Sequence, residues 1–205
     1  MRALVFLFVL ISMAACTQKQ SDKPQQAKTA AVTANTAGST RPEAAVAPEV
    51  NPPGDIPDTQ AFVRYQSVAG GFQLEVPEGW ARTENGPVST FFDKFNGVKV
   101  VVASALGAPT VASARANEAQ GIASSGHAVT ITDMSAVALP GGRAVVIRYT
   151  SNSDPNAVTN SRVRLENEAI LFFKDGKEVT LTLWAPQGAD NVDQWSRMSK
   201  SFRWQ

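Results

Sequence analysis

Short turn signals between apolar, β-branched runs recur from residue 62 onward, and they constrain the fold more than any other feature of the chain. The turn signals are Gly70-Gly71, Asn96-Gly97, Pro140-Gly141-Gly142 and Asp175-Gly176. Such pairs between strand-like runs are typical of β-hairpins. After Asp175-Gly176, apolar residues at 179, 181 and 183 alternate with Thr180, Thr182 and Trp184, a period of two that predicts a strand with one buried face. The sequence therefore predicts a largely antiparallel sheet.

Two segments have helical spacing instead. The first follows Pro109, and its small side chains fall on one stripe, at Ala112, Ala116, Ala119 and Ala123. The second lies near the C-terminus, where we expect Asp190 as the N-cap and Asp193 in the first turn. The residues predicted to share one face of the second helix are Val192, Trp195, Met198 or Ser199, and Phe202.

Strands interrupted by one helix and closed by another indicate an α+β domain. The stretches GGFQLEVPEGW and DQWSRMSKSFRW resemble the opening and closing signatures of the PsbP-like domain. The resemblance spans residues 62–204 and implies an antiparallel β-sheet flanked by helices on both faces, an α/β/α sandwich. In the first stretch, Pro77 would stop a strand, Gly79 would permit a turn and Trp80 would fold back onto the core.

The composition changes sharply near residue 61. Residues 16–60 contain no aromatic side chain and are rich in Ala, Thr, Gln and Pro. Such a segment cannot bury enough apolar surface to offset its ordering entropy, which predicts a disordered tether. All four tryptophans and both tyrosines lie in residues 61–205, the predicted globular domain. The 19 Lys and Arg against 18 Asp and Glu give no large field of one sign, so we expect no nucleic-acid partner.

The single cysteine, Cys16, stands where an apolar run ends and a polar run begins. Arg2, the apolar residues 3–11 and the small Ala14 and Ala15 have the order of a secretory signal, here residues 1–15. The sequence SMAAC resembles the bacterial lipobox, with Met13 where the pattern prefers leucine. The resemblance implies a diacylglycerol on the Cys16 sulfur and cleavage just before it, which would attach the protein to a membrane. The alternative is a plain signal peptide and an idle thiol.

Catalytic and cofactor signals are weak. His127 is the only histidine, in a predicted loop, where a solvated or capping role is the simpler interpretation. Glu75 and Glu78 flank Pro77 at a strand end and more simply solvate that edge than act as an acid/base pair. No Gly-rich phosphate loop leads from a strand into a helix, and the Cys and His content cannot build a usual zinc site. We therefore predict no enzyme activity, no metal and no cofactor.

The polar stretch from Ser151 to Ser161 is longer than a hairpin needs, and such loops often carry binding. Arg162 and Arg164, followed by Glu166 and Glu168, alternate with apolar residues and predict a charged strand face. One hypothesis makes this region a docking surface for a protein partner, with the candidate residues Asp154, Asn156, Arg162 and Arg164. The other is a solvated face with ion pairs that contribute little each.

These features together favour an exported, lipid-anchored, non-catalytic protein that faces the periplasm or the cell exterior. It would act as a binding or assembly accessory module with a protein partner in the envelope. The alternative implied by the resemblance is an extrinsic or assembly factor of photosystem II, and a third option is a secreted hydrolase. Both alternatives have weaker support from the sequence, since fold similarity alone does not establish a function.

Overall fold

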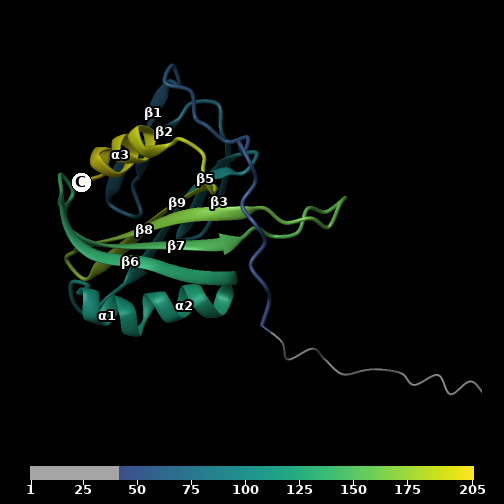
Figure 1. The fold of residues 1–205 in the computed structure, drawn as a ribbon. Coiled ribbons are helices and arrows are strands. Elements are labelled where there is room, and N and C mark those ends of the chain that lie inside the picture. The colour runs from purple at the N-terminus through teal and green to yellow at the C-terminus, as the bar shows by residue number, and fades with distance from the viewer. Residues whose placement is uncertain (1–41) are drawn as a thin grey trace, which may run out of the picture. The chain divides into compact units, whose positions relative to one another are not determined.

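The computed structural model describes residues 42–205 (Figure 1). The predicted signal segment, Cys16 and the first part of the predicted tether lie outside the described residues. The strands of the described part are β1 Phe62–Ser67, β2 Phe72–Pro77, β3 Ala81–Asn85, β4 Val88–Asp93, β5 Asn96–Ser104, β6 His127–Leu139, β7 Gly142–Asn152, β8 Arg164–Lys174, β9 Lys177–Pro186 and β10 Arg203–Trp204. Its helices are α1 Val111–Ala116, α2 Glu118–Ser125 and α3 Val192–Ser201.

Seven strands form one antiparallel sheet in the order β3-β4-β5-β9-β8-β7-β6. A smaller sheet, β1-β2-β10, is separate from it and was not predicted. Helices α1 and α2 lie on one side of the large sheet and α3 on the other (Figure 1). The predicted α+β fold class, an antiparallel sheet with helices on both faces, is confirmed.

Three of the four predicted turns connect the expected strands where the sequence places them. Asp175 and Gly176 both have positive φ, 49° and 78°, as a two-residue turn between β8 and β9 requires. Asn96 and Gly97 do not form the β4–β5 turn, because Asp93 pairs with Asn96 and the turn residues are Lys94 and Phe95.

Gly97 has a packing role instead. It lies opposite Trp184 on β9, and a β-carbon on residue 97 would stand 1.8 Å from Trp184 Cζ2. The glycine therefore provides the space that the indole occupies, which explains why an Asn-Gly pair occurs inside a strand.

The larger core lies on the α3 side of the sheet, which we call the closed face. Phe202 lies at its centre, stacked on Phe172 with ring centroids 4.0 Å apart and on Phe72 at 5.5 Å. The alternating apolar residues of β9 point into this core, as their period predicted. They are Val179, Leu181 and Leu183, all fully buried.

A smaller core lies under α1 and α2, on what we call the open face, and the predicted alanine stripe is wrong there. Ala114 and Ala119 are the buried alanines, whereas Ala112, Ala116 and Ala123 are exposed. The helical conformation is interrupted at Asn117, between α1 and α2. Because of this interruption, the buried side of α2 is rotated relative to the buried side of α1.

Helix α3 begins one residue later than predicted, with Asn191 rather than Asp190 at its N-cap. Met198 and Phe202 are buried as expected, but Val192 is exposed. The Asn191 side chain does not cap the helix. It accepts from Ile56 N at 2.6 Å and donates to Gly54 O at 2.9 Å, and so binds the segment before β1.

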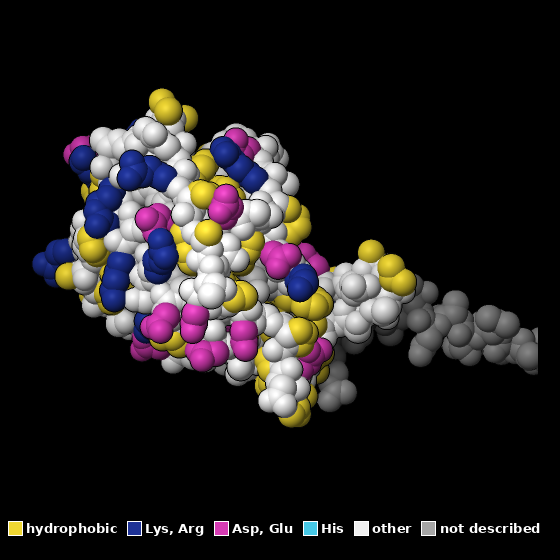
Figure 2. Space-filling model, turned by 90° about the horizontal axis from the view of Figure 1, so that it is seen from above, with side chains coloured by type: hydrophobic (Ala, Val, Ile, Leu, Met, Phe, Trp, Pro, Cys, Tyr) yellow, Lys and Arg dark blue, Asp and Glu magenta, His cyan; other side chains and the backbone are white. Residues whose placement is uncertain are grey.

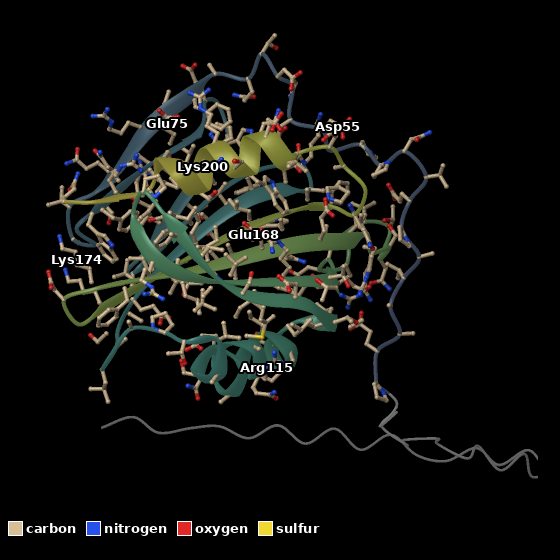
Figure 3. All side chains as sticks on the ribbon, turned by 60° about the vertical axis from the view of Figure 1, so that its left-hand side comes forward. Asp55, Glu75, Arg115, Glu168, Lys174 and Lys200 are labelled. Atoms are coloured by element: carbon tan, nitrogen blue, oxygen red, sulfur yellow. The ribbon has the colours of Figure 1, made fainter. Side chains whose placement is uncertain are left out.

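That segment, residues 42–60, is the strap, and it corrects the predicted boundary at residue 61. Ile56 is buried in the main core, and Val46 N donates to Asn152 Oδ1 at 3.0 Å. Asp55 accepts a hydrogen bond from Asp190 N at 2.9 Å, and Figure 3 shows Asp55 beside the start of α3. The strap lacks aromatic residues, yet its backbone is held by asparagine side chains of the body, a source of order that composition does not reveal.

Charges of both signs are mixed on the side of the molecule that carries α3. Figure 2 shows basic side chains mostly at the left of this face and acidic ones along its lower edge. None of the helices within residues 42–205 is both long and apolar enough to cross a bilayer.

Candidate functional site

The open face of the large sheet is only partly covered, and the uncovered part forms a groove. Helices α1 and α2 pack over β6 and over parts of β7 and β8, and side chains of β5 and β9 line the hollow beside α2. The hollow, which we call the open groove, measures about 620 Å³. Its lining includes Phe95, Lys99, Val101, Ile122, His127, Tyr149, Ser151, Asp154, Asn156, Leu165, Asn167, Thr182 and Trp184.

The floor of the open groove combines aromatic and hydrogen-bonding side chains. Trp184 and Thr182 come from β9, and Tyr149 and Ser151 from β7. Asn167 Nδ2 donates to Ser151 Oγ at 3.0 Å, which fixes both polar groups in the floor. Burial raises the pKa of Tyr149 to about 12, so its phenol stays protonated at neutral pH. A ligand with both apolar and polar parts would find partners for each.

The two ends of the groove carry different charges. Lys94 and Lys99 line it at the β4–β5 end. Asp154 and His127 line it at the other end, with the Asp154 side chain 93% exposed and its Oδ1 3.3 Å from His127 Nε2. The groove is therefore polarised along its length.

The loop between β7 and β8, residues 153–163, forms one wall and projects away from the body (Figure 1). Asn156 Oδ1 accepts from Val158 N at 2.9 Å and from Thr159 N at 3.0 Å, which closes a tight turn at the loop tip. This turn places Val158 in solvent, 92% exposed. The loop thus has a defined shape and presents an apolar side chain to solvent at its tip.

Glu43 of the strap contacts Asn152, His127 and Arg162, and we call these four residues the clasp. The Glu43 carboxylate accepts from Asn152 Nδ2 at 2.8 Å and contacts His127 Nδ1 at 2.8 Å and Arg162 Nε at 3.4 Å. The Asn152 and His127 hydrogen bonds hold the pKa of Glu43 below its usual value. Arg162 also donates to Ser153 O at 2.7 Å, so the clasp braces the base of the loop.

Arg164 lies inside the protein, 6% exposed, and the predicted charged strand face is wrong at this residue. Its guanidinium donates to Ala128 O at 2.8 Å, to Asn152 Oδ1 at 3.1 Å and to Thr150 Oγ1. The burial lowers the pKa of Arg164, and the three acceptors compensate for its lost hydration. The alternation of charges did not reveal that Arg164 faces the interior, because its acceptors come from β6 and β7, which precede it by 12 to 36 residues in the sequence.

The structure brings two of the four predicted docking residues to the groove. Asp154 and Asn156 line it, whereas Arg162 contacts Glu43 of the strap and Arg164 is bound to β6 and β7 in the interior. The role of these residues in partner binding stays a prediction.

The groove floor was missed from the sequence. A signal was present, since Trp184 shares the Thr180–Thr182 face of β9, and a large aromatic on a polar face indicates either packing or binding.

The catalytic candidates His127 and Glu75 both have charged neighbours. Both ring nitrogens of His127 contact carboxylates, those of Glu43 and Asp154. Glu75 accepts from Arg197 Nε at 2.8 Å and forms a surface ion pair. Within residues 42–205, no three His, Cys, Asp or Glu side chains gather in a group that could hold a metal ion.

Comparison with known proteins supports the fold. No protein-family model matches the chain, and no curated protein matches it. The solution structure of cyanobacterial PsbP (CyanoP) from Synechocystis sp. PCC 6803 is similar, with a TM-score of 0.52 and 16% identity, over 74% of this chain and 98% of that chain. The crystal structure of the Ran-binding protein Mog1p from Saccharomyces cerevisiae gives a TM-score of 0.48 at 9% identity, over 71% of this chain and 96% of that chain. At this identity, the similarity to CyanoP shows a shared fold and no more.

Proposed function

We propose that this protein is a lipid-anchored, non-catalytic binding module of a bacterial envelope, and that the open groove receives a segment of a protein partner. The observation that carries the proposal is the groove itself. It is an uncovered part of a sheet face with an aromatic floor, fixed hydrogen-bonding groups and a projecting loop at its side.

The anchor part of the proposal is supported by the sequence alone. Cys16 follows Ala14 and Ala15 in a pattern that resembles the lipobox. A lipid on this sulfur would keep the protein at a membrane, and two or more acyl chains would make the attachment stable. The segment between Cys16 and residue 42 would then separate the body from the lipid surface.

The partner part of the proposal follows from the chemistry of the groove. Trp184 and Leu165 offer apolar contact area, and Thr182 and Asn167 offer donors and acceptors. Aromatic residues of this kind are enriched at protein interfaces, where one side chain supplies area and hydrogen bonding together. The opposite charges at the two ends would fix the direction of a bound segment.

A photosystem role would rest on the fold shared with CyanoP, and no feature of the groove favours it over another envelope complex. A hydrolase role likewise has no supporting geometry in the described residues. We propose neither role.

Fractionation of cells that express the full chain tests the anchor, with Cys16→Ser compared with the wild type. We expect the wild type in the membrane fraction and the variant in the soluble exported fraction. Mass spectrometry of the mature N-terminus should find acyl groups on residue 16, and a bare thiol or processing elsewhere would contradict the anchor.

Quantitative pull-down from crosslinked cells tests the groove, with Thr182→Trp as the blocked variant. Thr83→Trp is the matched control, because Thr83 is exposed on β3 and does not line the groove. We expect Thr182→Trp to lose the envelope proteins that the wild type and Thr83→Trp retain. If all three proteins captured the same set of envelope proteins, the result would contradict partner binding in the open groove.

A further inference from the structure

A second hollow lies on the closed face, between α3 and the strands β6, β7 and β8. It measures about 460 Å³, within the range of small-molecule sites, and we call it the α3 cavity. Its apolar walls include Val146 and Ile170 from the sheet, Leu139 from the end of β6, and Trp195 from α3. The α3 cavity and the open groove thus belong to opposite faces of the large sheet.

Glu166 on β8 lines the α3 cavity and is half-buried. Burial raises the pKa of its carboxyl group. Among residues 42–205, no hydrogen bond or ion pair reaches this carboxylate. A carboxylate that has lost part of its water without gaining a protein partner is a favourable site for a donor or a cation from outside.

The neighbouring charges do not neutralise Glu166. Glu168 also lines the cavity, but it is bound to Arg148 Nε at 2.8 Å, and Arg148 Nη1 further donates to Asp133 at 3.0 Å. Lys200 reaches the cavity from the last turn of α3, is exposed and forms no ion pair with Glu166. Figure 3 shows Glu168 on the sheet and Lys200 on α3, on the same side of the sheet.

We propose that the α3 cavity binds a primary ammonium group on an aliphatic stem. The ammonium would donate to the Glu166 carboxylate, and the stem would lie against Val146 and Ile170. Trp195 lines the cavity from α3 and would add apolar area and cation–π attraction. None of these four residues lines the open groove, so the proposal stands apart from the proposed function.

Binding of hexylammonium to the exported form of the protein with Cys16→Ser tests the site, with hexanol and hexanoate as the neutral and anionic analogues. Titration followed by amide chemical shifts should give shifts at β8 and α3. We expect hexylammonium to bind about tenfold more tightly than hexanol, as a hydrogen bond to a charged group contributes.

Glu166→Gln should remove this preference for the cation. Glu178→Gln is the matched control, because Glu178 is also half-buried with a raised pKa but lies on β9 outside the cavity. Equal affinity for hexylammonium and hexanol in the wild type would overturn the proposal. Tighter binding of hexanoate, or no shift at β8 and α3, would do the same, and these readouts on the wild type do not depend on how the variants fold.

Discussion

The two faces of the large sheet differ in how completely they are covered. The closed face is packed by α3, the small sheet and the strap around stacked phenylalanines, and the α3 cavity lies between α3 and β6–β8. On the open face, α1 and α2 cover parts of β6, β7 and β8, and Trp184 and Thr182 of β9 line the open groove beside them. The comparison teaches that the two faces of one sheet can be packed to different extents, since alternate residues of a strand face opposite ways.

The largest expected effect tests the closed face. Phe202→Ala should lower the free energy of unfolding by about 3–5 kcal/mol, because it removes a fully buried ring that packs against three other aromatic rings. Urea denaturation measures the change. Phe92→Ala, at a ring 41% exposed, is the control and should cost much less. Similar losses in both variants would break the contrast between the faces.

Gly97→Ala should lower the free energy of unfolding by up to about 3 kcal/mol, since the new methyl group would overlap the Trp184 ring. The substitution should also displace the Trp184 ring and change its fluorescence. Gly107→Ala serves as the control, because a methyl group on residue 107 would meet no atom within 4 Å and the φ of this residue is not positive. A Gly97→Ala protein as stable as the wild type would contradict the packing described for the groove floor.

Arg164→Met should cost about 2 kcal/mol of unfolding free energy, because three acceptors lose their donor inside the protein. Arg162→Met should cost less, since Arg162 is more exposed and its carboxylate partner lies at the surface. Thermal or urea denaturation of the two variants would show this order. The reverse order would make Arg164 an external residue, as the sequence predicted.

The smallest effect concerns the clasp, and it depends on pH. The pKa of Glu43 is lowered when the strap is bound, so the free strap binds protons more readily. The contribution of Glu43 is therefore complete above its usual pKa of 4.5 and is lost as the pH falls through the lowered value. Hydrogen exchange at Val46, measured relative to the intrinsic exchange rate at each pH, should show strong protection at pH 6 and weaker protection near pH 3, while Glu43→Gln should show weak protection at both. If exchange at Val46 did not depend on residue 43, the result would contradict the role of the clasp in holding the strap.

Much of the closed face could be predicted from the sequence. The period of two in β9 identified its buried residues, and the Asp-Gly and Gly-Gly turns connected the right strands. These features are local, because turn chemistry and alternation act over a few residues.

The open groove and the strap could not be predicted in this way. Asn152 and Asn191 hold the strap across more than 100 residues of sequence, and such contacts leave no periodic pattern. The break at Asn117 likewise changed the buried side of α1 and α2, and a continuous helical wheel could not anticipate it.

The most direct test of the account places a photoreactive crosslinking residue at single positions of the full chain in living cells. At Thr182 or Asn156, both in the open groove, the account predicts one shared envelope protein in the crosslinked product. At Asp193, which is exposed on α3 at the opposite face, it predicts that this product is absent. The same product from Asp193, or none from either groove position, would contradict the claim that the open face is the binding side.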